Sequence, residues 1–183
     1  MSGQIDDARQ AIVAAVKAHL GSHVTVEAHG GRFDRVELAR YSKRAPAVLI
    51  AAMGFPRVEE RPRSRPQVQF AAFVMCRDAP GAPRDTQALT LAEALVRLVP
   101  RNQWGRDDAE SPANISAENL YSGEIDRLGI AMWAVSWRQT IALTALRDVS
   151  ELADFAIYSG THEIGNGPDT ESYLELPTGN EET

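Results

Sequence analysis

Histidine and cysteine are the residue types of this chain best suited to metal binding and nucleophilic chemistry, and its 183 residues include four histidines and one cysteine. His19, His23 and His29 surround the end of an amphipathic helical pattern, whereas His162 stands beside Glu163 far along the chain. Zinc sites combine several His or Cys ligands at short fixed spacings, such as HExxH, and no such motif is present. We therefore expect the three early histidines to be surface or capping residues, and the sequence predicts no metal site.

The single cysteine, Cys76, lies in an apolar run that is typical of a buried strand. A reactive thiol needs a nearby cation or a helix N-terminus to lower its pKa, and the surrounding residues provide neither. The glycine pair at 30–31 fits neither phosphate-binding loop motif. Without a nucleophile beside a base, or paired carboxylates, the chain is not expected to be an enzyme or to need a cofactor. A small enzyme with a cryptic site at His23, His29 or His162 is the catalytic alternative.

Arginines dominate the segment between residues 55 and 66, which also contains three prolines. This composition prevents a packed helix or strand and predicts an exposed loop. Arginine suits phosphate contacts, but two glutamates interrupt the cluster and no aromatic residue lies between the arginines for base stacking. We expect the loop either to be solvated or to pair with an acidic protein segment. Its arginines are Arg57, Arg61, Arg63 and Arg65.

The charges are separated along the chain, and this separation says more than the net charge of -6. Residues 1–147 hold all 19 Lys and Arg with 16 Asp and Glu, a formal charge of +3, whereas residues 148–183 hold nine acidic residues and no Lys or Arg. The sequence thus predicts a folded domain over 1–147 and an acidic C-terminal arm over 148–183. The arm is expected either to be solvated or to dock on a basic surface, its own or a neighbour's.

The elements that must position these residues are predicted from hydrophobic periodicity. Apolar residues at helical spacing predict helices over 5–20 and 85–99, the second with Asp85 or Thr86 as its N-cap, and residues 34–44 suit a short surface helix. Alternating or continuous apolar runs predict strands over 24–28, 46–52, 68–77, 114–121 and 130–143. The expected fold is α+β, with two main helices flanking a mixed or largely antiparallel sheet.

The last two predicted strands form a distinctive feature. The run 130–143 is far longer than the usual strand of about 5 to 6 residues, so it is expected to bend, to carry a bulge or to project from the sheet. Paired with 114–121, it predicts a long projecting β-hairpin, which is a common assembly device. Trp133 and Trp137 lie on one side of the strand and are expected to fill the core.

The sequence does not predict contact with a membrane. No stretch reaches the roughly 20 apolar residues of a membrane helix, and the N-terminal residues lack the basic start and apolar centre of a signal peptide. We therefore expect a cytoplasmic chain.

Several short pieces of the sequence follow one another in a distinctive order: a helix, a Gly-Gly pair, an apolar Ala-Pro strand, a second helix and an Asn-Leu-Tyr-Ser-Gly hairpin. They occupy 30–34, 44–50, 118–123 and 129–137, with an acidic close from 152–155 to 174–177. In content and order these pieces resemble the tail terminator (tail completion) proteins of Mu-like phages and prophages, and the resemblance extends over most of the chain.

The resemblance implies a structural virion protein whose subunits form a ring, expected to be hexameric, at the head-proximal end of the tail. Such a ring stops polymerisation of the tail tube and provides the docking surface for the head-tail connector. The implied partners are further copies of the chain, the tail tube protein and the connector protein, with DNA only passing through the channel. The implied location is the neck of the virion, after assembly in the host cytoplasm. A head-to-tail adaptor or stopper of the same neck is the alternative.

The candidate contacts of such an assembly are cations and aromatic residues. We expect them in the arginine-rich loop, in the hairpin and in the acidic arm. The candidate assembly interface comprises Arg57, Arg61, Arg63, Arg65, Tyr121, Arg138, Phe155, Tyr158 and Tyr173.

Overall fold

The computed structural model describes residues 3–56, 65–144, 158–162 and 170–174. The chain divides into two compact units, Met1–Ala145 and Leu146–Thr183. Four residues of the candidate interface lie outside the described ranges, namely Arg57, Arg61, Arg63 and Phe155.

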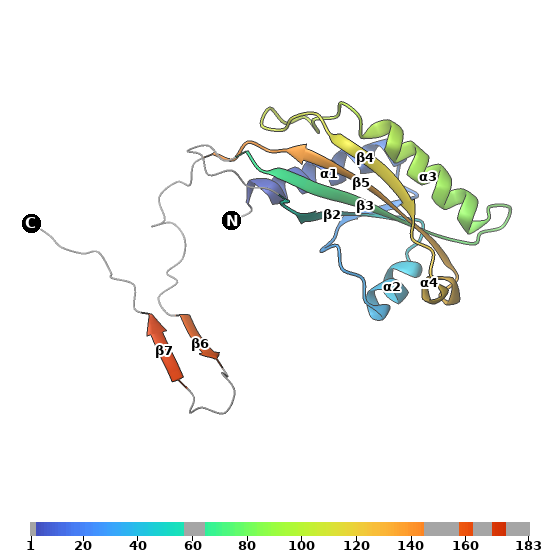
Figure 1. Cartoon of the computed structure of the whole chain (residues 1–183). Coiled ribbons are helices and arrows are strands. Elements are labelled where there is room, and N and C mark those ends of the chain that lie inside the picture. Colours follow the sequence, from blue (N-terminus) through green and yellow to red (C-terminus); the bar gives the residue numbers. More distant parts are fainter. Residues whose placement is uncertain (1–2, 57–64, 145–157, 163–169, 175–183) are drawn as a thin grey trace, which may run out of the picture. The chain divides into compact units, whose positions relative to one another are not determined.

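A five-stranded sheet forms the centre of the first unit (Figure 1). Its strands lie in the order β1-β2-β3-β5-β4, in which β1 and β2 are parallel and the other neighbours are antiparallel. The strands are β1 (Thr25–Ala28), β2 (Ala47–Gly54), β3 (Gln67–Arg77), β4 (Ala113–Asn119) and β5 (Ile130–Thr140). This largely antiparallel sheet with its flanking helices confirms the predicted α+β fold.

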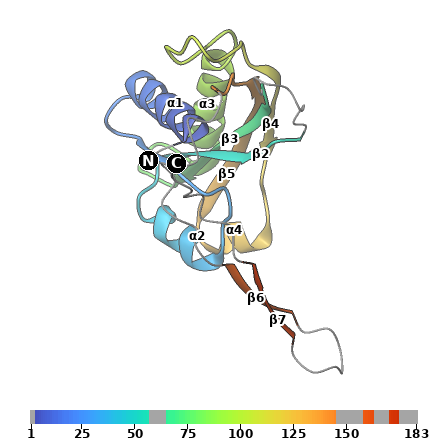
Figure 2. The same ribbon diagram turned by 90° about the vertical axis from the view of Figure 1, so that its left-hand side faces the viewer.

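Two long helices cover one face of the sheet, and two short helices lie on the other side (Figure 2). The long ones are α1 (Gln4–Leu20) and α3 (Arg84–Leu98), which agree with the predicted helices to within one residue. The short ones are α2 (Arg35–Ser42) and α4 (Gly123–Arg127). The buried residues of α1, Ala8, Ile12, Val16 and Leu20, recur every fourth position, so one stripe of the helix packs on the sheet.

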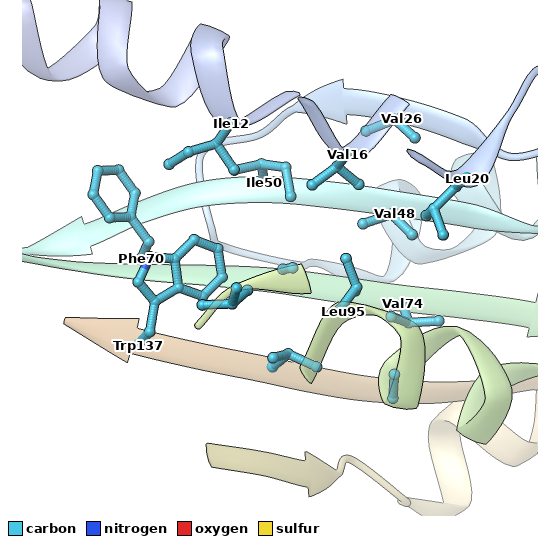
Figure 3. Packing of buried hydrophobic residues seen from close by; sticks show 14 of the residues in the cluster. Ile12, Val16, Leu20, Val26, Val48, Ile50, Phe70, Val74, Leu95 and Trp137 are labelled. Atoms are coloured by element: carbon cyan, nitrogen blue, oxygen red, sulfur yellow. The ribbon is translucent and has the colours of Figure 1, made fainter. Parts of the chain in front are cut away.

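The larger hydrophobic core lies between the sheet and the two long helices (Figure 3). Ile12 of α1, Ile50 of β2 and Leu95 of α3 are completely buried there. The rings of Phe70 and Trp137 stack with centroids 5.9 Å apart, which confirms that Trp137 fills the core. A smaller cluster lies on the opposite face, where Leu38 and Tyr41 of α2 pack over Leu49, Phe73 and Met132.

The predicted hairpin is present as β4 and β5, but it does not project from the sheet. All 11 residues of β5 pair with β3, and β4 pairs with the other side of β5. A strand between two neighbours forms backbone hydrogen bonds on both sides, so β5 stays within the sheet. The predicted strand over 130–143 therefore ends early, and Ile141 makes only an isolated bridge with Ala109. The bulge occurs in the neighbouring strand instead, between Ala113 and Ser116 of β4.

The starts of two helices also differ from the prediction. The connection between β4 and β5 contains α4, in which the Ser122 hydroxyl oxygen accepts the backbone N–H of Ile125 at 3.2 Å. The N-cap of α3 is Pro83 rather than Asp85 or Thr86, because Asp78 accepts the N–H of Arg84 at 3.0 Å from outside the helix. Both starts depend on local hydrogen bonds that hydrophobic spacing does not reveal.

The second unit contains a two-stranded antiparallel sheet of β6 (Tyr158–His162) and β7 (Thr170–Leu174). In its register Tyr158 lies opposite Leu174, and Tyr173 lies opposite Ser159. Among the helices in the described ranges, none is both long and apolar enough to cross a membrane.

Candidate assembly surfaces

Cys76 and the histidines were the candidates for chemistry. The described residues include no group of three or more His, Cys, Asp or Glu side chains placed to hold a metal ion. Cys76 is completely buried on β3, and this burial raises the pKa of its thiol to about 11. The thiol is therefore protonated at neutral pH, and a protonated thiol is a poor nucleophile. Cys76 acts as a small core residue.

The three early histidines were expected to be surface or capping residues; His19 and His23 are exposed, whereas His29 is buried and is not a surface residue. The Nδ1 atom of His29 accepts the N–H of Gly31 at 3.0 Å, and its ring stacks on Phe33 with centroids 4.4 Å apart. Its Nε2 atom lies 3.4 Å from a Glu37 carboxylate oxygen. These contacts hold the turn after β1 against helix α2. We therefore assign His29 a structural role.

The strand β4 forms one edge of the sheet, and six of its seven residues are exposed. Leu120, just after β4, donates its N–H to the carbonyl oxygen of Met132 at 2.9 Å. Because bonding alternates along an antiparallel pair, Glu118 and Ser116 also direct their backbone groups toward β5. The N–H and C=O groups of the alternate residues, such as Ala117, point away from the sheet. This free edge can accept another strand.

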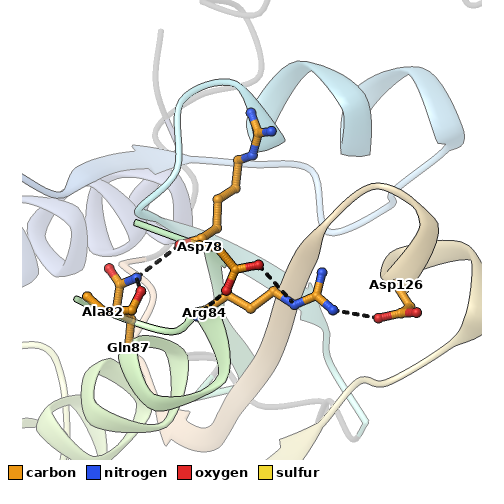
Figure 4. Close-up of polar contacts among 6 residues, drawn as sticks. Asp78, Ala82, Arg84, Gln87 and Asp126 are labelled. Atoms are coloured by element: carbon orange, nitrogen blue, oxygen red, sulfur yellow. Dashed lines mark hydrogen bonds and ion pairs between the residues drawn. The ribbon is translucent and has the colours of Figure 1, made fainter. Parts of the chain in front are cut away.

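Tyr121 lies at the end of this edge with 72% of its surface exposed. The neighbouring helix α4 is held by Arg84 of α3, whose Nη2 atom donates to Asp126 at 2.6 Å and whose Nε atom lies 3.9 Å from Asp78 (Figure 4). Gln87 donates to the carbonyl oxygens of the last β3 residue and of the turn before α3. These contacts fix the corner from which Tyr121 extends.

Arg138 lies on β5, between Gln69 of β3 and Ala113 of β4. By the two-residue period of the strand, its side chain is on the face opposite α1 and α3, where Ser136 shares a hydrogen bond of 2.9 Å with Ser116. Arg138 is half-buried, and no ion pair joins it to a carboxylate of the described residues. It lies at the other end of β4 from Tyr121.

Arg65 lies just before β3 and pairs with Glu110 at 3.2 Å. Both side chains are more than half exposed, so this ion pair contributes little to stability. Arg65 and Arg138 lie near the same end of the sheet, whereas Tyr121 is at the far end; Tyr158 and Tyr173 belong to the second unit. Within the first unit, Arg65, Arg138 and Tyr121 therefore form no single cluster.

A further exposed surface lies on α2, and the sequence reasoning missed it. We define the α2 basic face as the exposed side of this helix, lined by Arg35, Val36, Ala39, Arg40, Lys43 and Arg44. Val36 has 76% of its surface exposed although it is apolar. The sequence signal for this face is Val36, an apolar residue at helical spacing from the cations Arg40 and Lys43. From the sequence, this segment is predicted only as a short surface helix.

Comparison with known proteins shows a similarity to a prophage protein. The chain is 24% identical to the Mu-like prophage FluMu protein gp37 of Haemophilus influenzae over 192 aligned positions, which cover 95% of this chain and 91% of that protein. No protein-family model matches the chain. This similarity supports the assignment of the chain as a Mu-like phage protein.

Proposed function

We propose that this protein is a phage tail terminator, a structural subunit that forms a ring at the head-proximal end of the tail tube. The ring stops polymerisation of the tube and provides the docking surface for the head-tail connector. The observation that carries the proposal is the similarity to a Mu-like prophage protein along nearly the whole of both chains. Two of the pieces of sequence that resemble tail terminators, 118–123 and 129–137, lie at the end of β4 and along β5, and so adjoin the exposed edge of the sheet.

The free edge of β4 supports this role because it offers unpaired backbone groups to another protein. Natural proteins usually protect an exposed edge with prolines, lysines or bulges. β4 has a bulge near its start, but its second half, from Ser116 to Asn119, keeps a regular register and contains neither Pro nor Lys. A strand of a neighbouring subunit or of the tube can add there. The proposed mechanism is thus interface geometry rather than catalysis.

The partners in this proposal are further copies of the chain in a hexameric ring, the tail tube protein and the connector protein. DNA only passes through the channel, and the protein resides in the neck of the virion. The acidic arm, residues 148–183, contacts a neighbouring subunit or the tube. Its nine acidic residues are opposite in sign to the excess of cations in residues 1–147, so the two parts attract each other.

Deletion of the gene tests the proposal, with electron microscopy of the resulting lysate as the readout. Loss of a terminator gives overlong or irregular tails, and a plasmid copy of the gene restores the normal length. Normal free tails beside unjoined heads would instead identify a head-to-tail adaptor. Native mass spectrometry of the purified protein gives a second readout, because a monomer that is absent from virion necks contradicts both roles.

The catalytic alternative is tested by replacing His23 and His162 with alanine. His23 is exposed, so the change leaves the core intact. Normal particle assembly by this variant counts against an enzymatic role for these histidines.

A further inference from the structure

The α2 basic face combines an apolar residue with cations at helical spacing. Val36, Arg40 and Lys43 are separated by four and three residues, which places them on the same side of the helix. All three are exposed, and the helical backbone continues through Lys43, whose φ and ψ are -71° and -18°. The face therefore presents two positive charges around an apolar centre.

The charges of Arg40 and Lys43 are not neutralised by neighbouring carboxylates of the described chain. Glu27 pairs with Arg44 through two hydrogen bonds, and Glu37 lies against His29. Arg40 only lies over the ring of Tyr41, 5.4 Å from its centroid. The local acids are thus engaged elsewhere, and the positive potential of this face is available to a partner.

We propose that the α2 basic face binds the acidic C-terminal segment, residues 148–183, of a second copy of the chain; this inference rests on the proposed ring. The segment has a formal charge of -9 with no Lys or Arg, so it complements the face in sign. Its acids also alternate with large apolar residues, as in Glu-Ser-Tyr-Leu-Glu-Leu at 171–176. A peptide of this composition can place carboxylates on Arg40 and Lys43 and an apolar side chain on Val36.

The symmetry of such a contact fits a ring. A face on one subunit that binds a different segment of the next is a heterologous contact, and repetition of a heterologous contact closes a ring when the rotation allows it. Each copy provides one face and one segment, so every subunit has one neighbour on each side. The contact between exposed charges also weakens as salt is added, because the screening length falls.

Nucleic acid is the other class of partner that a basic surface attracts. Single-stranded nucleic acid is usually held by aromatic side chains that stack on its bases, and the α2 basic face has Val36 and Ala39 at its centre instead. An apolar centre of this kind matches a peptide side chain better than a phosphate backbone. The observations therefore favour the acidic segment.

The test uses the full chain and the variant Arg40→Glu with Lys43→Glu. The variant is expected to weaken self-association at low salt by at least about tenfold in dissociation constant, measured by analytical ultracentrifugation. The matched control, Lys17→Glu with Arg127→Glu, makes the same change of charge at exposed positions on α1 and α4 and is expected to assemble like the wild type. Circular dichroism and thermal unfolding of both variants check that the fold is retained.

A charge swap identifies the partner segment. Adding Glu171→Lys and Glu175→Lys to the first variant is expected to restore association, whereas these two changes alone are expected to weaken it. Association of Arg40→Glu with Lys43→Glu that equals the wild type overturns the inference but leaves the ring intact. A wild-type chain that is monomeric at all concentrations overturns the proposed ring itself. A third outcome is that the wild type binds duplex DNA and the variant Arg40→Glu with Lys43→Glu loses this binding without a change in self-association. The partner of the α2 basic face is then nucleic acid rather than the acidic segment.

Discussion

The indole Nε1 atom of Trp104 donates a hydrogen bond of 2.7 Å to the side-chain oxygen of Gln139, a residue with only 1% of its surface exposed. The amide nitrogen of Gln139 donates in turn to the carbonyl oxygens of Asn102 and Glu110, at 3.2 Å and 2.6 Å. One buried side chain therefore fastens the loop between α3 and β4 to strand β5. Because β4 follows this loop directly, the same contacts position the exposed edge of the sheet.

Replacement of Gln139 by leucine is expected to lower the free energy of unfolding by about 2 to 4 kcal/mol, since it removes the partner of the Trp104 and Trp137 indole N–H groups and of two carbonyl oxygens. Urea denaturation followed by tryptophan fluorescence measures the change. Gln69→Leu is the matched control, because Gln69 is half-buried on the neighbouring strand β3 and its loss is expected to cost less than about 0.5 kcal/mol. Equal effects of the two substitutions would contradict the role given to Gln139.

Gln139 also shows where sequence reasoning stopped short. It lies on the inward side of β5 between Trp137 and Ile141 and is buried, but it was not assigned to the core from the sequence. Its polarity argued against burial, and only the tertiary partners Trp104 and Glu110 explain it. The long helices and the positions of the strands along the chain follow from repeated apolar spacing, whereas a satisfied polar core residue depends on contacts between distant parts of the chain.

The same reason explains why the structural surroundings of the candidate interface residues were only partly predicted. Hydrophobic periodicity located β4 and β5 and therefore Tyr121 and Arg138 near the ends of one hairpin. It gave no sign that β5 is paired on both sides, because pairing with β3 depends on a strand more than 50 residues away in sequence. The short helix α4 was missed because its five residues depend on a serine cap and on the contact between Asp126 and Arg84 rather than on an apolar stripe.

Gly31 is expected to tolerate no side chain. Its φ of +79° is strained for other residues, and a Cβ atom there would lie 2.6 Å from the Met53 sulfur and 3.2 Å from the Ala51 Cβ. Gly31→Ala should therefore destabilise the protein by about 1 to 3 kcal/mol, measured by thermal or urea unfolding. The adjacent Gly30→Ala is the control, because no atom lies within 4 Å of the Cβ it adds. A loss at Gly30 as large as that at Gly31 would disprove this explanation.

Cys76 is expected to make the protein less stable at high pH. Burial raises its pKa from 9.0 to about 11, so between these values the folded state keeps a proton that the unfolded state has lost. Stability therefore falls as pH rises through this interval, because the unfolded state binds fewer protons. The measurement is the difference in urea stability between the wild type and Cys76→Ala, at pH 8 and above pH 9. A difference that does not change with pH would show that the thiol ionises equally in both states.

The free edge of β4 gives a prediction that separates assembly from folding. Ala117 directs its N–H away from the sheet, whereas the adjacent Ser116 directs its N–H toward Ser136 of β5. Proline has no N–H and is tolerated on an edge strand where that group faces solvent. Ala117→Pro is therefore expected to preserve the fold and to weaken self-association by at least about tenfold, because it removes the donor that an added strand would use.

Ser116→Pro, one residue away, is expected to destabilise the fold, unlike Ala117→Pro. It removes a ladder hydrogen bond to β5 and is expected to lower the free energy of unfolding by about 3 kcal/mol. Analytical ultracentrifugation and urea unfolding of the two variants, measured side by side, give both quantities. If Ala117→Pro unfolds the domain as Ser116→Pro does, the hydrogen-bond register of β4 is wrong. If Ala117→Pro assembles normally, subunits join through another surface, and the edge of β4 is not the contact that closes the ring.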